Sequence, residues 1–201
     1  MILAFDTSTA ACTAALFDGA GECIARADEQ IGRGHAERLV PMIDELLDGR
    51  RAESIIVGVG PGSFTGIRVA IAAAHGLAIG WGAELVGMSS LALLAAGATG
   101  SDVAVAVLGG HGELFVQEFG ASGEPVSELR NLPPSSAAVV TKTDLVIGSG
   151  ARQLVDARGS GEAREALPTA ADALRLPADL RNLPPKPVYA RAPDARAKEA
   201  A

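Results

Sequence analysis

The chain has 201 residues and a net charge of −7, from 17 Lys+Arg and 24 Asp+Glu. Apolar residues make up 48% and charged residues 20%, which is typical of a folded domain with its own core and not of a disordered chain. The acidic balance and an aromatic content of only 3% argue against autonomous binding to nucleic acid or to an anionic membrane.

Cysteines and apolar segments bear on the cellular compartment. Cys12 and Cys23 form neither a disulfide framework nor a Cys-x-x-Cys motif, so we expect reduced structural thiols. The longest apolar stretch, Val69–Ile79, is shorter than the roughly 18–20 residues that cross a bilayer. The N-terminal apolar run has no basic region and is interrupted by Asp6, unlike a signal peptide. We therefore predict a cytoplasmic protein with no membrane association.

The first half of the chain predicts a β-meander followed by alternating helices and strands. Strands are expected at Ile2–Phe5, Ala11–Phe17 and Glu22–Gln30, separated by polar and Gly-rich turns. A helix follows from about His35 to Leu47, where apolar residues recur at helical spacing. A buried strand is expected next at Ser54–Val59, followed by a tight loop at Gly60–Thr65 and a helix at Gly66–Gly80. A short strand at Glu84–Gly87 then leads to a third helix, which is capped by Ser89 or Ser90 and ends at Ala96.

The second half is less regular. A hairpin is expected from Val103–Leu108 and Glu113–Phe119, then a strand at Asp144–Ile147 and a helix beginning near Ala151. Residues 192–201 read as a frayed tail. Because both halves open with a hairpin after an apolar strand, the sequence carries a faint sign of duplication. The predicted class is α/β, with helices packed on mixed sheets.

Familiar catalytic motifs are absent from the sequence. No Lys follows a Gly-rich loop, which excludes a Walker A loop, and no Gly-x-Ser-x-Gly elbow surrounds a serine. The histidines, His35, His75 and His111, lack partners at the spacing of a helical zinc site. We therefore expect no self-contained metal or nucleophile site.

Two loops could nevertheless hold a nucleotide. Asp6-Thr7-Ser8-Thr9 forms the turn of the first hairpin, where a carboxylate can position Mg²⁺ and hydroxyls can hold phosphate oxygens. The alternative is an Asp that closes the turn through local hydrogen bonds. The glycines and proline of Gly60–Arg68 permit unusual backbone geometry before a helix whose first amides favour an anion, or they form only a well-capped turn. The candidate phosphate-binding residues are Asp6, Thr7, Ser8, Gly62 and Ser63.

The helix after the second loop is apolar around most of its circumference, so more than one side should be covered. Its small residues allow close approach by another helix. Either a partner protein covers the second side, or the second half of the chain does. The first helix has a second group of apolar residues beside its main apolar face, Met42 and Leu46, which suggests that it too is covered on a second side. The expected partner-contacting residues are His35, Leu39, Met42, Leu46, Arg68, Ala72, His75 and Ile79.

Several strings resemble the TsaB (YeaZ) family. They are Ile2-Leu-Ala-Phe-Asp6-Thr-Ser-Thr9, His35-Ala-Glu-Arg-Leu-Val-Pro41, Val59-Gly-Pro-Gly-Ser-Phe-Thr-Gly-Ile-Arg68, Val86-Gly-Met-Ser-Ser-Leu91 and Pro187-Val-Tyr-Ala-Arg191. The resemblance is dense over residues 1–95 and thin afterwards. It implies an actin/Hsp70-like (ASKHA, ribonuclease H-like) fold of two related subdomains, here 1–98 and 99–201.

The resemblance also implies a function. In bacterial formation of N6-threonylcarbamoyladenosine next to the tRNA anticodon, TsaB-like proteins are non-catalytic partners of the TsaD-type transferase, with a TsaE-type ATPase associated. They dock through two helices of the first subdomain and form homodimers with a similar surface. The tRNA is reached only through the complex. ATP or ADP with Mg²⁺ at the interface with TsaD is a further expectation, with no cofactor held tightly by this chain alone.

The sequence departs from the transferase itself. TsaD-like proteins carry a His-x-x-x-His metal pair where this chain has Ser90 and Leu94. A second acidic turn, needed for a complete actin-like nucleotide site, is replaced by Gly109-Gly110-His111. The alternative function is an actin-like ATPase or kinase relative that binds Mg-ATP by itself through Asp6 and Ser8. A peptidase is disfavoured because the metal pair and the nucleophile elbow are both missing.

Overall fold

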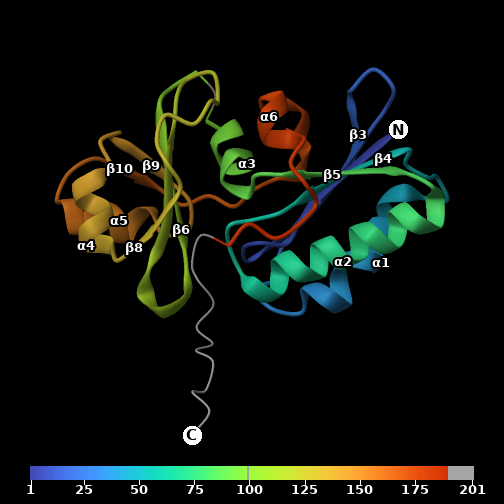
Figure 1. Ribbon diagram of the computed structural model, residues 1–201, viewed down its shortest axis with the longest axis horizontal. Coiled ribbons are helices and arrows are strands. Elements are labelled where there is room, and N and C mark those ends of the chain that lie inside the picture. Colours follow the sequence, from blue (N-terminus) through green and yellow to red (C-terminus); the bar gives the residue numbers. More distant parts are fainter. Residues whose placement is uncertain (99, 190–201) are drawn as a thin grey trace, which may run out of the picture.

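The computed structural model describes residues 1–98 and 100–189, which form two five-stranded sheets with flanking helices (Figure 1). The expected tail at 192–201 and the end of the Pro187–Arg191 string lie outside the described residues. The first sheet contains β1 (Ile2–Asp6), β2 (Ala11–Phe17), β3 (Cys23–Gln30), β4 (Ser54–Gly58) and β5 (Glu84–Met88). The helices of this half are α1 (His35–Leu47), α2 (Phe64–Trp81) and α3 (Ser90–Ala96).

The second half repeats the arrangement with shorter elements. Its strands are β6 (Val103–Leu108), β7 (Leu114–Phe119), β8 (Arg130–Leu132), β9 (Leu145–Ile147) and β10 (Glu162–Arg164). Its helices are α4 (Pro134–Val140) and α5 (Ala151–Arg158), and the short helices η1, η2 and α6 cover Gly110–Gly112, Ala170–Arg175 and Ala178–Arg181.

The two sheets have the same topology, which confirms the duplication. The strand order is β3-β2-β1-β4-β5 in the first sheet and β8-β7-β6-β9-β10 in the second. In each sheet the first three strands are antiparallel, and the last two run parallel to the first. The helix pairs α1/α2 and α4/α5 occupy matching places in the chain. The α/β, actin-like fold class expected from the sequence is therefore correct.

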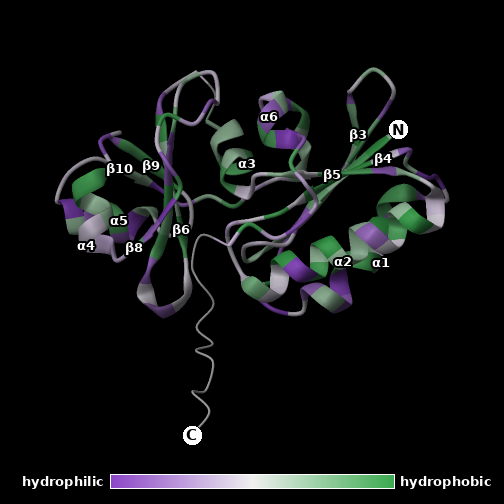
Figure 2. Ribbon diagram, viewed as in Figure 1, coloured by the Kyte–Doolittle hydropathy of each residue, from purple (hydrophilic) through white to green (hydrophobic). Residues whose placement is uncertain are grey.

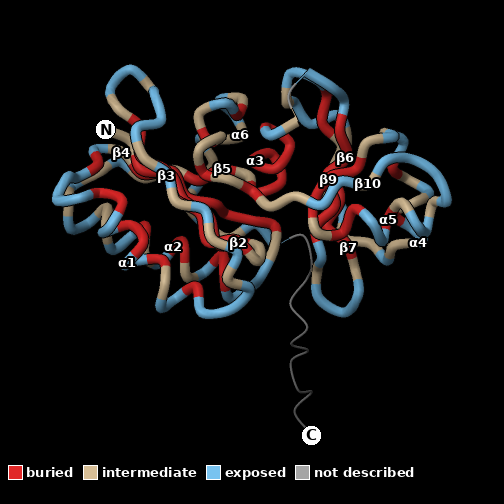
Figure 3. The backbone as a smooth tube through the Cα atoms, turned by 180° about the vertical axis from the view of Figure 1, so that it is seen from behind, coloured by how far each residue is buried: buried red, intermediate tan, exposed pale blue. Residues whose placement is uncertain are grey.

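Alternating side chains of each sheet separate three hydrophobic cores. Residues such as Leu3 and Phe5 of β1 face α1 and α2, whereas Ala4 faces the centre of the molecule. The central core contains α3, η2 and one face of each sheet. The outer face of the second sheet packs on α4 and α5. Figure 2 shows apolar strands in both sheets, and Figure 3 shows that α3 and the central strands are the most deeply buried segments.

The C-terminal part of the described chain returns to the first sheet. Ala170 N donates to Thr13 Oγ1 at 2.7 Å, and Leu183 pairs with Gly87 at the edge of β5. We call residues 183–189 the C-terminal strap. The division expected between residues 98 and 99 stays a prediction, and the strap and η2 cross it to pack on the first half.

The cysteines occupy different environments. Both are free. Cys12 lies in the core beneath α1, where burial raises the pKa of its thiol to about 11, so it is a structural thiol. Cys23 is exposed on the edge strand β3.

Among the described residues, α2 alone is long and apolar enough to cross a membrane by length and composition. It is longer than the apolar stretch recognised in the sequence because it includes Phe64–Arg68 and Gly80–Trp81. In the fold it lies on the first sheet beside α1, with five residues buried on one side: Gly66, Ile67, Ala70, Ile71 and Ala74. The cytoplasmic location stays a prediction.

Arg38 links α1 to the edge strand β3. Its guanidinium donates to both oxygens of Glu29, at 2.8 and 2.6 Å, and to both oxygens of Glu45, at 2.9 and 3.0 Å. These hydrogen bonds hold the pKa of each carboxyl below its ordinary value of 4.5. A carboxyl whose pKa is lower in the folded state stabilises the fold above its unfolded pKa, and that stabilisation is lost as the pH falls.

Arg38→Met is therefore expected to lower the urea midpoint of unfolding at pH 7. The difference from the unmodified chain should shrink as the pH falls below about 4.5, where the carboxyls of the unfolded chain become protonated. Urea titrations between pH 3 and pH 7 measure this. Arg33→Met, which removes an arginine at an exposed position before α1, is the control and should show no such dependence. A difference that is constant across this range would contradict the proposed charge coupling.

Candidate functional site

The turn after β1 is closed by the chain's own polar groups. Asp6 is 0% exposed, and its Oδ1 accepts hydrogen bonds from Ser8 N and Ser8 Oγ, both at 2.7 Å. Its Oδ2 accepts from Ser90 Oγ at 2.5 Å. Both carboxylate oxygens are thus satisfied inside the protein. Asp6 therefore closes the turn through local hydrogen bonds, which is the structural alternative expected from the sequence.

Ser90 ties this turn to the loop before α2. Its hydroxyl accepts from Gly60 N at 3.1 Å, and its backbone N–H donates to Gly60 O at 3.0 Å. One buried serine therefore connects β1, the Gly60–Ser63 loop and the start of α3. In the transferase relatives this position was expected to hold a metal-binding His, whereas here it completes a hydrogen-bonded core. Leu94, the second expected position, is also buried.

Three glycines let the loop before α2 press against the turn. A Cβ at Gly58 would overlap Asp6 Oδ2, one at Gly62 would overlap Ser8 O, and one at Gly66 would overlap Thr7 O. The contacts are reinforced by Ser63 N, which donates to Ser8 O at 2.7 Å, and by Thr7 Oγ1, which donates to Gly66 O at 2.7 Å. The glycine pattern of this loop thus serves close packing.

This geometry corrects the nucleotide assignment for three of the five candidates. Asp6, Thr7 and Ser8 are each at most 1% exposed, and the loop leaves no room for a phosphate against them. Ser63 is exposed and Gly62 is half-buried, with the Ser63 side chain capping α2 through Gly66 N. The equivalent turn of the second half, Gly109–Gly112, carries no carboxylate. The expectation that the isolated chain holds no Mg-ATP tightly stays a prediction.

Ser90→Ala tests the buried network. The substitution leaves Gly60 N and one oxygen of Asp6 without their buried partner, so we expect a loss of about 1–3 kcal/mol in the free energy of unfolding. Chemical denaturation monitored by the single tryptophan measures it. Ser135→Ala, an exposed serine of α4, is the control. A loss no larger than that of the control would refute the role of the network.

The α1 residues assigned to a partner interface face the sheet instead, which is a correction. Leu39, Met42 and Leu46 are 0%, 1% and 8% exposed and belong to the core beneath the helix. His35 is 8% exposed, with Nε2 3.2 Å from Ala11 O. The apolar face of α1 is wide because the helix covers the sheet and also contacts α2. The second group of apolar residues on this helix, Met42 and Leu46, is therefore buried within the chain.

The α2 residues assigned to the interface lie on an open surface. Arg68, Ala72 and His75 are exposed, and Ile79 is 83% exposed. They occur at intervals of three and four residues, so they form one stripe along the helix, opposite the side packed on the sheet. In the part of the chain that the structure describes, all four residues keep exposed side chains. Its use as an interface stays a prediction.

Two aromatic residues next to the stripe were missed by the sequence analysis. Phe64 is 56% exposed and Tyr189 is 48% exposed, with ring centroids 5.8 Å apart. The Arg68 guanidinium lies 3.6 Å from the centroid of Phe64, and its Nε donates to the Tyr189 hydroxyl at 3.1 Å. Tyr189 is 121 residues from Arg68 in the chain, so no local pattern could have joined them. The Pro187–Arg191 string was a signal of similarity only.

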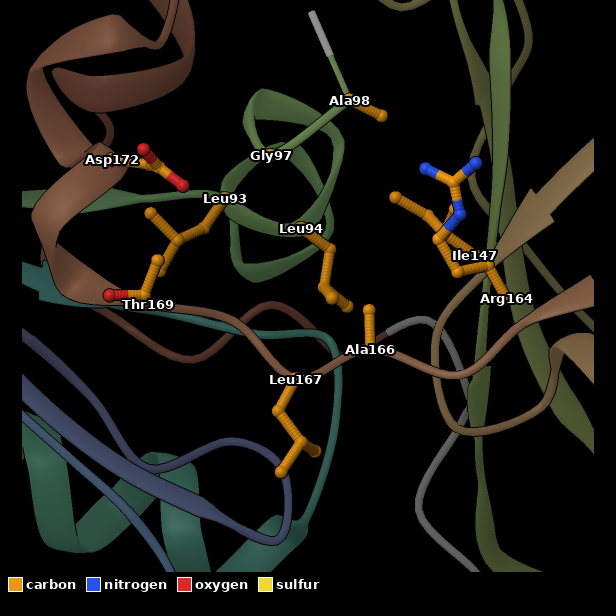
Figure 4. Close-up of a pocket in the computed structure, with 10 residues that line it drawn as sticks. All are labelled: Leu93, Leu94, Gly97, Ala98, Ile147, Arg164, Ala166, Leu167, Thr169 and Asp172. Atoms are coloured by element: carbon orange, nitrogen blue, oxygen red, sulfur yellow. The ribbon is translucent and has the colours of Figure 1, made fainter.

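A cavity of about 110 Å³ lies beside α3, between the two sheets (Figure 4). Its lining is mostly apolar, with Leu93 and Leu94 from α3 and Ile147 from β9. Its charged groups are paired, because Arg164 contacts Glu162 at 3.0 Å and Asp172 contacts Arg175 at 2.9 Å. The cavity contains none of the predicted site residues. No cluster of three His, Cys, Asp or Glu residues suited to a metal occurs within residues 1–98 and 100–189.

Comparison with known proteins gives consistent matches. The family model for TsaD, tRNA N6-adenosine threonylcarbamoyltransferase, matches residues 28–131. The tRNA threonylcarbamoyladenosine biosynthesis protein TsaB of Escherichia coli (strain K12) is 36% identical over 128 residues, which are 59% of this chain and 54% of that protein. TsaB of Haemophilus influenzae is 40% identical over 100 residues, covering 47% of this chain and 41% of that protein. The chain thus spans about half the length of these curated relatives.

The solved structures match over more of the chain. YeaZ from Pseudomonas aeruginosa superimposes with a TM-score of 0.80 at 32% identity, covering 94% of this chain and 98% of that one. A protein from the same organism, described as similar to peptidase YEAZ, gives a TM-score of 0.81 at 33% identity, covering 94% and 99%. Both halves of the fold are therefore shared with these structures.

Proposed function

Since this chain belongs to the TsaB (YeaZ) family, we propose that it is a non-catalytic subunit in the threonylcarbamoylation of tRNA adenosine. Its partner is a TsaD-type transferase, which it binds and activates through the exposed face of α2. A TsaE-type ATPase joins the complex, tRNA contacts come mainly from the partner, and the isolated chain forms a homodimer. The observation that carries the proposal is an open, largely apolar helix face on a chain whose acidic turn is filled by its own side chains.

The exposed face has the composition of a docking surface. Ala72, Gly76 and Gly80 are small, so another helix could approach α2 closely, and Ile79 offers apolar area to bury. Arg68 and His75 supply polar contacts at two levels of the helix and would set the register. Exposed apolar area is unfavourable in water, but it contributes binding free energy when a partner protein buries it.

The proposal is tested by reconstitution. Purified TsaD-type and TsaE-type proteins, the enzyme that makes threonylcarbamoyl-adenylate, and unmodified tRNA are combined with and without this chain. We expect modified nucleoside, measured by mass spectrometry of digested tRNA, only when the chain is present. Equal modification without it would refute the activating role, and activity of the chain in the absence of the TsaD-type protein would refute the non-catalytic one.

The alternative function, an ATPase or kinase that acts alone, conflicts with the filled turn around Asp6. Binding of Mg-ATP there would have to break the hydrogen bonds from Ser8 and Ser90 and separate Gly62 from Ser8. We expect calorimetry to detect no Mg-ATP binding by the isolated chain. If a nucleotide is shared at the interface with TsaD, only Gly62 and Ser63 of the five candidate residues are accessible to contact its phosphates. Tight binding by the isolated chain would restore the alternative.

A further inference from the structure

We propose that Phe64 and Tyr189 are positioning residues that hold the Arg68 guanidinium ready for a carboxylate of the TsaD-type partner. Tyr189 makes the C-terminal strap a part of the partner-binding face, although it is far from α2 in sequence. This inference rests on the proposed function and adds the recognition chemistry at one end of the α2 stripe.

The guanidinium is held from two sides. Its carbon lies 3.6 Å from the centroid of Phe64, one helical turn earlier on α2, and 5.9 Å from the centroid of Tyr189. The cation–π contact with Phe64 and the hydrogen bond from Nε to Tyr189 Oη together restrain the position and orientation of the group. The side chain thus loses rotational freedom before any partner binds, which lowers the entropic cost of a later contact.

Tyr189 is itself anchored by the strap. Leu183 and Gly87 exchange backbone hydrogen bonds at 2.7 and 2.9 Å, and Val188 N donates to Val59 O at 2.9 Å. The residue next to Tyr189 is therefore bonded to the end of the strand that leads into the loop before α2. These backbone contacts place the phenol beside Phe64 and Arg68 of α2.

The open side of Arg68 fits a carboxylate. With Nε bonded to Tyr189, the two terminal nitrogens make no hydrogen bond or ion pair with any residue of 1–98 or 100–189. The α2 sequence contains no Asp or Glu, so Arg68 lacks a counter-charge on its own helix. A docked partner would desolvate this cation, which is costly unless the partner supplies an acceptor. The planar pair of nitrogens matches a carboxylate in a bidentate contact.

The residues around Arg68 favour a protein surface as the source of this carboxylate. Arginine and aromatic residues are enriched at the centre of protein interfaces, and the cluster continues into the stripe of Ala72, His75 and Ile79. The nearby helix face offers apolar and small side chains that suit packing.

A double-mutant cycle tests the positioning role. Binding of the full chain to the TsaD-type protein is measured by calorimetry for the unmodified chain, Tyr189→Phe, Arg68→Ala and the double variant. Tyr189→Phe keeps the ring and removes only the hydroxyl, and we expect about tenfold weaker binding. In the Arg68→Ala background the same change should alter binding less than about twofold, since the group it positions is gone. Phe64→Leu should behave like Tyr189→Phe.

Salt dependence and stability separate this role from a structural one. Raising the salt from 50 to 500 mM should weaken binding of the unmodified chain more than binding of Arg68→Ala. Thermal unfolding of the free Tyr189→Phe chain should match that of the unmodified chain. Equal losses from Tyr189→Phe in both backgrounds, or no loss in either, would overturn the inference.

The failure of this inference differs from the failure of the proposed function. If the unmodified chain does not bind the TsaD-type protein at all, both fall together. If it binds and the cycle shows no coupling, only the positioning role falls. If the coupling appears in self-association of the chain and not with the TsaD-type protein, the occupant is a second copy, which also contradicts the inference.

Discussion

Ala72→Trp is expected to weaken binding to the TsaD-type protein about a hundredfold while leaving the free chain folded. Ala72 is exposed at the centre of the α2 stripe, so an indole there meets solvent in the free chain. In a complex that depends on close helix approach, the added volume would overpack the interface, at a cost of about 2–3 kcal/mol. Calorimetric titration of the variant against the TsaD-type protein measures the change.

A matched control separates surface position from the bulk of the new side chain. Ala157 is an exposed alanine of α5, in the second half of the chain, and Ala157→Trp should bind within about twofold of the unmodified chain. Circular dichroism should show the same helical content for both variants. Undiminished binding by Ala72→Trp would remove α2 from the interface.

Gly66→Ala is expected to lower the free energy of unfolding by about 4 kcal/mol or more. A methyl group at this position would overlap the carbonyl oxygen of Thr7, which is backbone and cannot move aside as a flexible side chain could. The first turn of α2 would have to separate from the turn after β1. The hydrogen bonds from Thr7 Oγ1 to Gly66 O and from Ser63 N to Ser8 O would be strained or lost.

Substitution of Gly76, on the same helix, is expected to change the stability in the opposite direction. It is exposed, and a Cβ built there meets nothing within 4 Å. Gly76→Ala should therefore raise the stability by about 0.5–1 kcal/mol, because alanine loses less conformational entropy in a helix. Urea titration of both variants gives the comparison. A Gly66→Ala chain as stable as Gly76→Ala would contradict the packing described for the Asp6 turn.

The sequence predicted most of the first half because its elements are long and periodic. The strands from Ile2 to Gln30, and the helix at His35–Leu47, lie within one or two residues of the observed bounds. In the second half, β8, α4 and β10 were missed. They contain three to seven residues and lie directly beside prolines or glycines, so they carry too little periodicity to be distinguished from loops.

The site was harder to predict than the fold, for two physical reasons. An apolar helix face looks the same in sequence whether a partner or the chain's own sheet covers it, and Met42 and Leu46 were therefore placed on the wrong surface. A carboxylate in a Gly-rich setting suits either a phosphate or a close-packed turn, and only the positions of Ser90 and Gly58 decide between them. These contacts join segments about 50 to 80 residues apart, beyond any local pattern.

The most direct test of the central claim is the mass of the complex in solution. Light scattering after size-exclusion chromatography would be recorded for this chain alone, for the TsaD-type protein of the same organism, and for their mixture. We predict a new species with the mass of a one-to-one complex, formed at the expense of any homodimer, and its loss with Ala72→Trp. A mixture that elutes as the two separate proteins, with and without Mg-ATP, would contradict the proposal that this chain is a partner subunit.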